Sequence, residues 1–321
     1  MALSEFEIIR RFFTHRARGA VLGVGDDAAI VRTRRGMELA VSADMLVSGR
    51  HFFSDADPQQ LGHKSLAVNL SDMAAMGATP RWATLSIALP RVDARWLKAF
   101  MDGFMRLARR HRVDLVGGDT TRGPLTIAVQ IIGEVPAGSA LRREGARAGD
   151  DIWVSGTIGA AALALAARKG RIRLATGERR RLEQKLHAPV PRIALGAALR
   201  GVARSAIDVS DGLVADLGHI CERSGVSAII EKTRVPLPGI KKYNLNQQVI
   251  STCMLSGGDD YELVFSAASA RRDSIARLAG RLRVKLTRIG KVIRRRKGPL
   301  VTVLDASGRP FPLGQTGYKH F

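Results

Sequence analysis

The sequence predicts an α/β (α+β) protein of two domains, and three observations lead to that prediction. The chain has 321 residues, of which 45% are apolar and 25% charged. This is a globular composition, with length for about two domains of roughly 100–200 residues. Apolar runs of strand length occur beside segments of helical periodicity in both halves. A stretch rich in Gly, Ala and Arg over 136–149 separates the halves. We therefore expect domains over 1–137 and 138–321.

In the first half, the clearest helix is predicted over 93–111. Trp96, Phe100 and Phe104 recur there at helical spacing, while the arginines lie off their face. Leucines at similar spacing predict a second helix over 58–76. The remaining expected elements of this half are a short amphipathic helix over 5–13 and strands over 38–43, 83–89, 115–116 and 125–132.

In the second half, Pro189-Val-Pro191 interrupts the chain between two predicted helices, which cover 159–168 and 192–200. Short apolar runs predict strands over 151–155, 263–266 and 300–304.

Composition excludes several classes of protein. Two cysteines, Cys221 and Cys253, are too few and too far apart for a disulfide framework or a CxxC metal site. The longest run of apolar and small residues, 158–167, is about half the roughly 20 residues that a membrane span needs. The N-terminus lacks the pattern of a signal peptide. We expect a cytoplasmic protein without a membrane partner.

The formal net charge of +22 lies mostly in the second domain. Residues 1–137 carry a net charge of +4 and the rest +18, with basic clusters at 179–181 and 294–297. This excess is either a solvated Arg-rich surface or a surface that binds polyanions. Aromatic residues make up only 5%, and no zinc-finger, RNP or basic-zipper pattern is present. We do not expect nucleic acid as the main partner, although that alternative stays open.

Ten of the 29 acidic residues gather in six short segments rich in Gly and Ser, which we expect to be loops, most of them at strand ends. Adjacent carboxylates repel unless a cation lies between them. Mg²⁺ takes oxygen ligands and bridges carboxylates to phosphates, and glycines let backbone N–H groups approach a phosphate. The segments therefore predict a metal–nucleotide site; they are 23–29, 42–44, 69–77, 117–123, 208–213 and 256–263.

Other phosphate-binding motifs do not fit. No G-x4-G-K-[ST] loop and no H-R-D or D-F-G kinase signature is present. Residues 23–28 formally match the dinucleotide pattern G-x-G-x-x-[GA], but Asp26 and Asp27 would repel a pyrophosphate. The acidic loops therefore favour metal over NAD.

The order GVGDDAA, VSADMLVSGRHF, KSLAVNLSDMAAMGATP, GGDTTRG, AIDVSDGL, SGGDDYEL and GYKHF resembles the thiamine-monophosphate kinase family. That family belongs to the superfamily of aminoimidazole ribonucleotide synthetase and selenophosphate synthetase. The resemblance runs from about residue 4 to the C-terminus. It implies an N-terminal domain that forms a barrel-like dimer core and a C-terminal α+β domain that closes over the site. The implied reaction converts ATP and thiamine monophosphate to ADP and thiamine diphosphate with several Mg²⁺ ions.

The resemblance also assigns roles. Metal ligands would be Asp27, Ser42, Asp44, Asp72, Asp119, Asp208 and Asp211, with the backbone carbonyl of Ala43, where many members have Thr. Asp119 and Asp211 would act nearest the transferred phosphate. The nucleotide would contact Gly118, Asp119, Arg143 and Ser210. Thiamine monophosphate would contact His51, Asp259, where many members have Glu, and Tyr318. Some members have Trp near Gln315, so the aromatic assignment to Tyr318 stays open.

Not every residue of these motifs is expected to bind a ligand. For Asp26, Asp260 and Glu262 we expect hydrogen bonds that stabilise their loops, and Met73 and Met76 are expected in the core. Two alternatives to the kinase remain: a sister enzyme of the same superfamily that phosphorylates another acceptor, and a non-catalytic module that binds nucleic acid.

Overall fold

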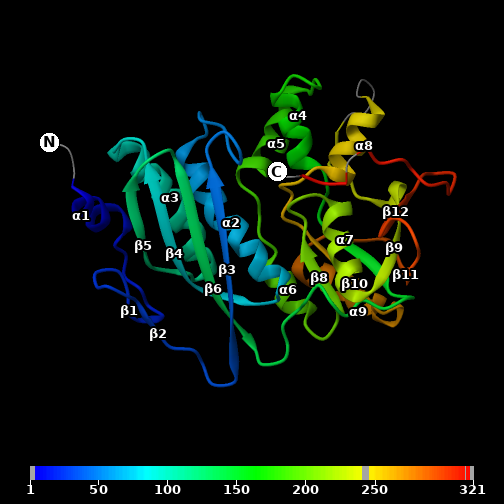
Figure 1. The fold of residues 1–321 in the computed structure, drawn as a ribbon, viewed down its shortest axis with the longest axis horizontal. Coiled ribbons are helices and arrows are strands. Elements are labelled where there is room, and N and C mark those ends of the chain that lie inside the picture. The colour runs from blue at the N-terminus through cyan, green and yellow to red at the C-terminus, as the bar shows by residue number, and fades with distance from the viewer. Residues whose placement is uncertain (1–3, 241–245, 315, 319–321) are drawn as a thin grey trace. The chain divides into compact units, whose positions relative to one another are not determined.

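The computed structural model describes residues 4–240, 246–314 and 316–318. The chain divides into two compact units (Figure 1). Unit 1 is formed by Met1–Met73 and Ala78–Gly138, and unit 2 by Ala74–Gly77 and Ser139–Phe321. Each unit combines helices with its own sheet, as predicted for a mixed α and β class.

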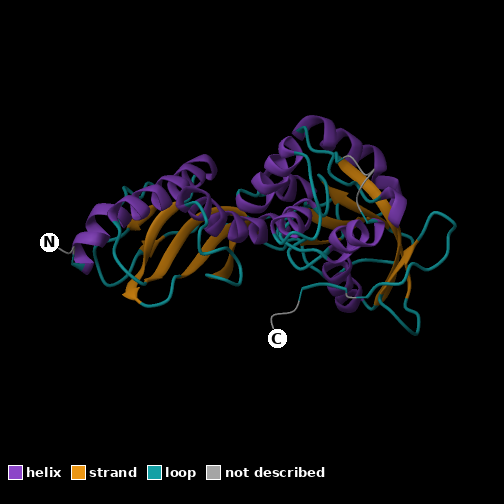
Figure 2. Cartoon of the chain, turned by 90° about the horizontal axis from the view of Figure 1, so that it is seen from above, coloured by secondary structure: helices purple, strands orange, loops and turns teal. Residues whose placement is uncertain are grey.

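Unit 1 is built on a four-stranded sheet in the order β3-β6-β4-β5. Only the pair β4 and β5 is parallel. Helices α2 and α3 lie on one face of this sheet (Figure 2). Their apolar sides and the sheet form a core in which Trp82, Phe100 and Phe104 are almost fully buried. The elements are α1 (Glu5–Ile8), η1 (Ile9–Phe13), β1 (Ala20–Leu22), β2 (Ile30–Val31), β3 (Met37–Val47), α2 (Pro58–Ala75), β4 (Thr79–Leu89), α3 (Ala94–His111), β5 (Asp114–Arg122) and β6 (Thr126–Pro136).

The amphipathic prediction over 93–111 is confirmed by α3. Asp93 caps this helix, because its carboxylate accepts hydrogen bonds from the backbone N–H groups of Arg95 and Trp96 at 2.9 and 3.1 Å. Arg112 ends it in the left-handed conformation, with φ of 57°. A side-chain cap therefore sets the start of this helix, and a change of backbone conformation at Arg112 ends it.

Unit 2 contains a six-stranded sheet in the order β12-β9-β11-β7-β10-β8, parallel only between β12 and β9. Its elements are β7 (Asp151–Ser155), α4 (Ala160–Arg168), α5 (Thr176–His187), α6 (Ile193–Leu199), β8 (Ser205–Asp208), α7 (Leu213–Ser224), β9 (Val226–Glu231), η2 (Lys232–Arg234), α8 (Gln247–Ser256), β10 (Leu263–Ala267), η4 (Ser269–Arg271), α9 (Arg272–Leu282), β11 (Leu286–Arg294) and β12 (Val301–Leu304). The predicted strand over 151–155 matches β7.

Three of the six acidic segments that were expected to be loops lie on regular elements, as the predicted helix over 58–76 already required for Asp72. Residues 42–44 lie inside β3, Asp72 lies in α2, and Asp119 lies in β5. Backbone pairing continues through the polar residues, because β3 pairs with β6 along its full length and β5 pairs with β4 past Asp119. The predicted site residues of unit 1 therefore stand largely on regular elements.

Two further findings concern the chain as a whole. Within the part that the structure describes, no helix combines the length and apolar character that crossing a membrane requires. Cys221 and Cys253 are free and buried, and burial raises the pKa of each thiol to about 11.

Candidate functional site

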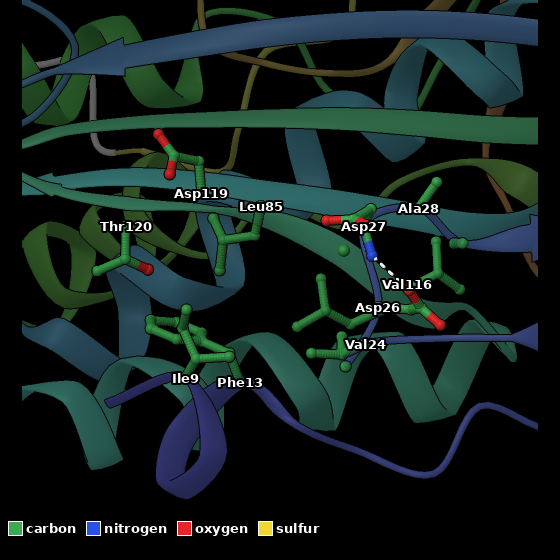
Figure 3. A pocket seen from close by; sticks show the side chains of 15 residues that line it. Ile9, Phe13, Val24, Asp26, Asp27, Ala28, Leu85, Val116, Asp119 and Thr120 are labelled. Carbon is green, nitrogen blue, oxygen red and sulfur yellow. Dashed lines mark hydrogen bonds between the residues drawn. The ribbon is translucent and has the colours of Figure 1, made fainter. Parts of the chain in front are cut away.

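Unit 1 contains a cavity of about 450 Å³ beside β5 (Figure 3). Its lining comes from η1, from the segment 24–29, from Leu85 of β4 and from residues 115–120. Asp27, Gly118 and Asp119, three residues that the resemblance singles out, line this one cavity together. Asp26 also lines it, and its carboxylate accepts a hydrogen bond of 2.9 Å from the backbone N–H of Asp27. Asp26 thus makes a hydrogen bond within its own loop, as expected.

The pairing of β5 with β4 requires a glycine at position 118, opposite Leu85. The φ of Gly118 is +150°, and a Cβ at this position would lie 1.9 Å from the carbonyl oxygen of Leu85. Only glycine can adopt this conformation and approach so closely. Gly118 and Asp119 both line the cavity.

A second group of predicted residues joins β3 to α2. The hydroxyl of Ser42 donates a hydrogen bond of 2.5 Å to the carboxylate of Asp72. Asp44 lies on the same face of β3 as Ser42, because side chains two residues apart in a strand point the same way. Ala43 points to the opposite face and is exposed, so it offers no side-chain donor to this group. Met73, beside Asp72, is buried in the core as predicted, whereas Met76 is half-buried.

His51 lies in the turn after β3. Its Nδ1 accepts a hydrogen bond of 3.0 Å from the backbone N–H of Val47. A neutral imidazole that accepts at Nδ1 carries its proton on Nε2. The turn therefore orients the ring and fixes which nitrogen can donate.

In unit 2, Asp208 ends β8, and Ser210 and Asp211 lie in the loop that leads to α7. The Oδ2 of Asp216, in the first turn of α7, accepts hydrogen bonds from the backbone N–H groups of Ser210, Asp211 and Gly212 at 3.0–3.1 Å. Burial raises the pKa of Asp216 to about 7, with a smaller contribution from the Asp211 carboxylate, while the three N–H groups act in the opposite direction.

The segment 256–263 packs against that loop. The backbone N–H of Asp259 donates to the carbonyl oxygen of Ser210 at 2.9 Å, and that of Tyr261 donates to Val209 at 2.9 Å. Asp259 and Tyr261 both have positive φ, 68° and 51°. The Tyr261 hydroxyl donates to the Asp259 carboxylate at 2.9 Å, which restricts the orientation of that side chain.

The carboxylates of Asp260 and Glu262 accept hydrogen bonds from other segments of unit 2, as expected for residues that stabilise this segment. Asp260 accepts hydrogen bonds from the backbone N–H groups of Gly159 and Ala161, at the N-terminus of α4. Burial raises its pKa to about 8, and the nearby Glu262 and Asp259 carboxylates add to that effect. Glu262 is buried and accepts hydrogen bonds of 2.6 Å from Ser155 and Arg192.

The remaining predicted residues of unit 2 are Arg143 and Tyr318. Tyr318 is 46% exposed, and its backbone N–H donates to the carbonyl oxygen of Asp211 at 2.9 Å. Arg143 is exposed on the segment before β7, where its carbonyl oxygen accepts from Ser224. Gln315 lies outside the described residues.

The sequence alone did not predict the hydrogen bonds of Asp216 to its loop or the ion pair of Arg192 with Glu262. For Asp216 the available signal was an acidic residue in the first turn of a helix that follows a Gly-containing loop. Arg192 and Glu262 are 70 residues apart, so no local pattern could reveal their contact.

The donor set of the predicted residues suits a hard cation, because carboxylate and hydroxyl oxygens are the ligands that Mg²⁺ prefers. Ser42 and Asp72 already contact each other. Among the described residues, no three His, Cys, Asp or Glu side chains are gathered closely enough to hold a metal ion by themselves. A bound phosphate chain is the usual source of the missing ligands.

Comparisons with known proteins agree with these motifs. The family model "AIR synthase related protein, N-terminal domain" matches residues 25–135, and the corresponding C-terminal domain matches 147–302. The chain is 43% identical to the thiamine-monophosphate kinase of Escherichia coli K12, over 100% of this chain and 99% of that protein. It is 32% identical to that of Bacillus subtilis, over 99% and 100%.

Solved structures of similar proteins were also found. The thiamine-monophosphate kinase of Stenotrophomonas maltophilia has a TM-score of 0.85 and 46% identity, covering 94% of this chain and 97% of that one. A structure described as "AaThiL complexed with AMPPCP and TMP" has a TM-score of 0.77 and 30% identity, covering 93% and 92%. With this identity and coverage, the chain belongs to the thiamine-monophosphate kinase family of AIR synthase related proteins.

Proposed function

We propose that the chain transfers the γ-phosphoryl group of ATP to thiamine monophosphate and so produces thiamine diphosphate and ADP. The observation that carries this proposal is the relative complexed with AMPPCP, an ATP analogue, and TMP, which is 30% identical over 93% of this chain. The acidic and glycine-rich segments that line the cavity of unit 1 and surround α7 in unit 2 suit phosphate chemistry independently of that likeness.

The reaction needs no general base. A phosphate monoester has a second pKa of about 6, so the acceptor oxygen of thiamine monophosphate is already ionised at neutral pH. The barrier comes from bringing two polyanions together, and catalysis depends on positioning and charge neutralisation. This explains why carboxylates, rather than a base and its orienting partner, dominate the predicted site.

Mg²⁺ would supply that charge neutralisation between the phosphate chain of ATP and the phosphate of thiamine monophosphate. The residues that would hold it are Asp27, Ser42, Asp44, Asp72, Asp119, Asp208 and Asp211, with the carbonyl oxygen of Ala43. Their oxygen donors fit Mg²⁺, and the contact between Ser42 and Asp72 brings two of them together. Asp119 and Asp211 would act nearest the transferred phosphate.

The other predicted residues would bind the two substrates. Gly118, Asp119, Arg143 and Ser210 would contact the nucleotide, and the Arg143 guanidinium suits phosphate oxygens. His51 would donate from Nε2 toward thiamine monophosphate, since its Nδ1 accepts from Val47. Asp259 would meet the aminopyrimidine or the cationic thiazolium of thiamine, and the exposed ring of Tyr318 would stack on these rings.

We also propose that the protein acts as a homodimer in which two copies of domain 1–137 complete a barrel. Edge strand β3 supports this, because Leu39, Val41 and Met45 are 46–57% exposed along one of its faces. An apolar stripe on an edge strand is a site for pairing with another chain. In this proposal domain 1–137 holds ATP and Mg²⁺, and the closure of domain 138–321 over the site remains a prediction from the family resemblance.

Two free buried cysteines support a reducing compartment, and we propose the cytoplasm as the site of the reaction. Nucleic acid is not among the partners that we propose.

The test is to incubate the purified protein with ATP, Mg²⁺ and thiamine monophosphate and to quantify ADP and thiamine diphosphate. Equal amounts of both products, dependent on Mg²⁺, are expected. If no thiamine diphosphate forms although ATP stabilises the protein against thermal unfolding, the acceptor is a different compound and the proposal is wrong.

A further inference from the structure

Asp216 is a buried carboxylate that none of the roles above uses. It is 2% exposed, and a single oxygen accepts the backbone N–H groups of three consecutive residues, Ser210, Asp211 and Gly212. The N-cap of α7 is Gly212, which has no side chain to cap the helix. Asp216 therefore reaches back from inside α7 to satisfy the N–H groups of the loop before it.

These three hydrogen bonds also orient the carbonyl groups of the loop toward the N–H groups of other segments. With the N–H groups held by Asp216, the carbonyl oxygen of Ser210 accepts from the N–H of Asp259 at 2.9 Å. The carbonyl oxygen of Asp211 accepts from the N–H of Tyr318 at 2.9 Å. The backbones of two predicted substrate-contacting residues are therefore attached to the loop that Asp216 holds.

Close packing leaves this arrangement little freedom. A Cβ at Gly258 would lie 2.1 Å from the carbonyl oxygen of Ser210, and one at Gly212 would lie 2.8 Å from the backbone of Ser256. The two segments are therefore in backbone contact, and a shift of the loop at 210–212 must displace the segment that carries Asp259.

We propose that Asp216 is a positioning residue for the phosphoryl transfer: its carboxylate fixes the loop of Ser210 and Asp211 and, through the carbonyl groups of that loop, the backbones of Asp259 and Tyr318. This inference rests on the proposed function, because it assigns Asp216 to the same reaction. Asp216 itself contacts backbone N–H groups rather than substrate.

The experiment compares two variants of similar side-chain shape. Asp216→Asn keeps an oxygen that can accept the three N–H groups, and Asp216→Leu removes it. We expect Asp216→Leu to raise KM for thiamine monophosphate at least tenfold and to lower kcat at least 100-fold. Asp216→Asn should keep both within about threefold of wild type. Asp216→Ser, whose hydroxyl is too short to reach the loop, should change both constants in the same direction as Leu.

Asp150 offers a matched control in the same unit. It is also 2% exposed, but its carboxylate accepts hydrogen bonds from Arg147 and Arg204, neither of which is a predicted site residue. Asp150→Leu should lower Tm while KM stays within about twofold. The inference is overturned if Asp216→Leu and Asp216→Ser keep the wild-type KM and kcat, or if Asp216→Asn is as impaired as Asp216→Leu.

Amide hydrogen exchange at residues 210–212 gives a readout that does not depend on turnover. Exchange should be faster in Asp216→Ser than in wild type and nearly unchanged in Asp216→Asn; equal protection in all three proteins overturns the inference. If the wild-type protein forms no thiamine diphosphate, the proposed function fails, while this exchange measurement still tests whether Asp216 holds the loop.

Discussion

The hydrogen bond of 2.5 Å from Ser42 to Asp72 is a direct contact between two predicted metal ligands in unit 1. It joins a strand to a helix, so neither side chain depends on a long loop for its position. Two predicted ligands of unit 2 are placed differently: Asp208 stands at the end of a strand, and Asp211 lies in a loop. Substitutions in unit 1 can therefore remove a ligand and leave the local backbone intact.

Asp72→Asn should lower turnover at least 100-fold with little change in Tm. The amide still accepts a hydrogen bond from Ser42, but it loses the negative charge that a cation between phosphate groups requires. Steady-state kinetics over a range of Mg²⁺ concentrations checks this. Asp102→Asn is the control, because Asp102 pairs with Lys98 on the exposed side of α3. Wild-type turnover and Mg²⁺ dependence in Asp72→Asn would remove Asp72 from the metal site.

Asp260 makes the stability of the protein depend on pH. Its pKa is about 8 in the folded chain against an ordinary value of 3.8, so the folded state binds this proton more tightly than the unfolded state. The stabilisation is complete below about pH 4 and is lost as pH rises toward 8. The free energy of unfolding should fall across this range by at most about 1.4 kcal/mol per pH unit.

Urea unfolding of the wild type and Asp260→Asn between pH 5 and pH 8 measures this contribution. The amide does not titrate but can still accept from Gly159, so the difference between the two proteins should change steadily with pH. Parallel curves would show that Asp260 is ionised throughout the range.

Among the elements, the pairing of β4 with β5 depends on one residue. A Cβ at Gly118 would overlap the carbonyl group of Leu85, whereas one at Gly117 would meet only a methyl group of Thr84 at 3.8 Å. Gly118→Ala should destabilise the protein by about 2–4 kcal/mol, and Gly117→Ala by much less. Urea unfolding of the two variants compares them. Equal stabilities would mean that β5 can move away from β4 at no cost.

Elements with a strong local signal were predictable from the sequence. Helix α3 has an apolar face and a capping Asp93, and both are visible within about 20 residues, whereas its left-handed end at Arg112 carries no glycine signal. Asp44 and residues 117–119 were expected in loops, because small and polar residues favour loops, but pairing with β6 and β4 holds them in strands. Strand β11, with the sequence LTRIGKVIR, was not predicted, since its basic residues mask the apolar alternation.

The same distinction applies to the candidate site. Its acidic residues were found because their segments are compact in sequence, and the motif order names the family. The supporting contacts were not found, because Asp216 to the loop before it and Arg192 to Glu262 are hydrogen bonds that only the fold creates.

For the whole molecule, the exposed face of β3 predicts the assembly state. Val41→Glu places a charge in the middle of the stripe formed by Leu39, Val41 and Met45. We expect the wild type to be a dimer and this variant a monomer in light scattering, since a buried unpaired charge is costly. Val92→Glu is the control, because Val92 is 44% exposed but lies in the segment between β4 and α3 and not on β3. A dimeric Val41→Glu protein would place the interface elsewhere.

The two buried cysteines have a practical consequence for chemical labelling. With a thiol pKa of about 11 for both Cys221 and Cys253, only about one thiol in 10,000 is a thiolate at pH 7, and only the thiolate reacts with maleimides. The native chain thus provides a nearly silent background. A single cysteine introduced at an exposed position such as Val190 can carry a fluorophore without first removing the natural thiols.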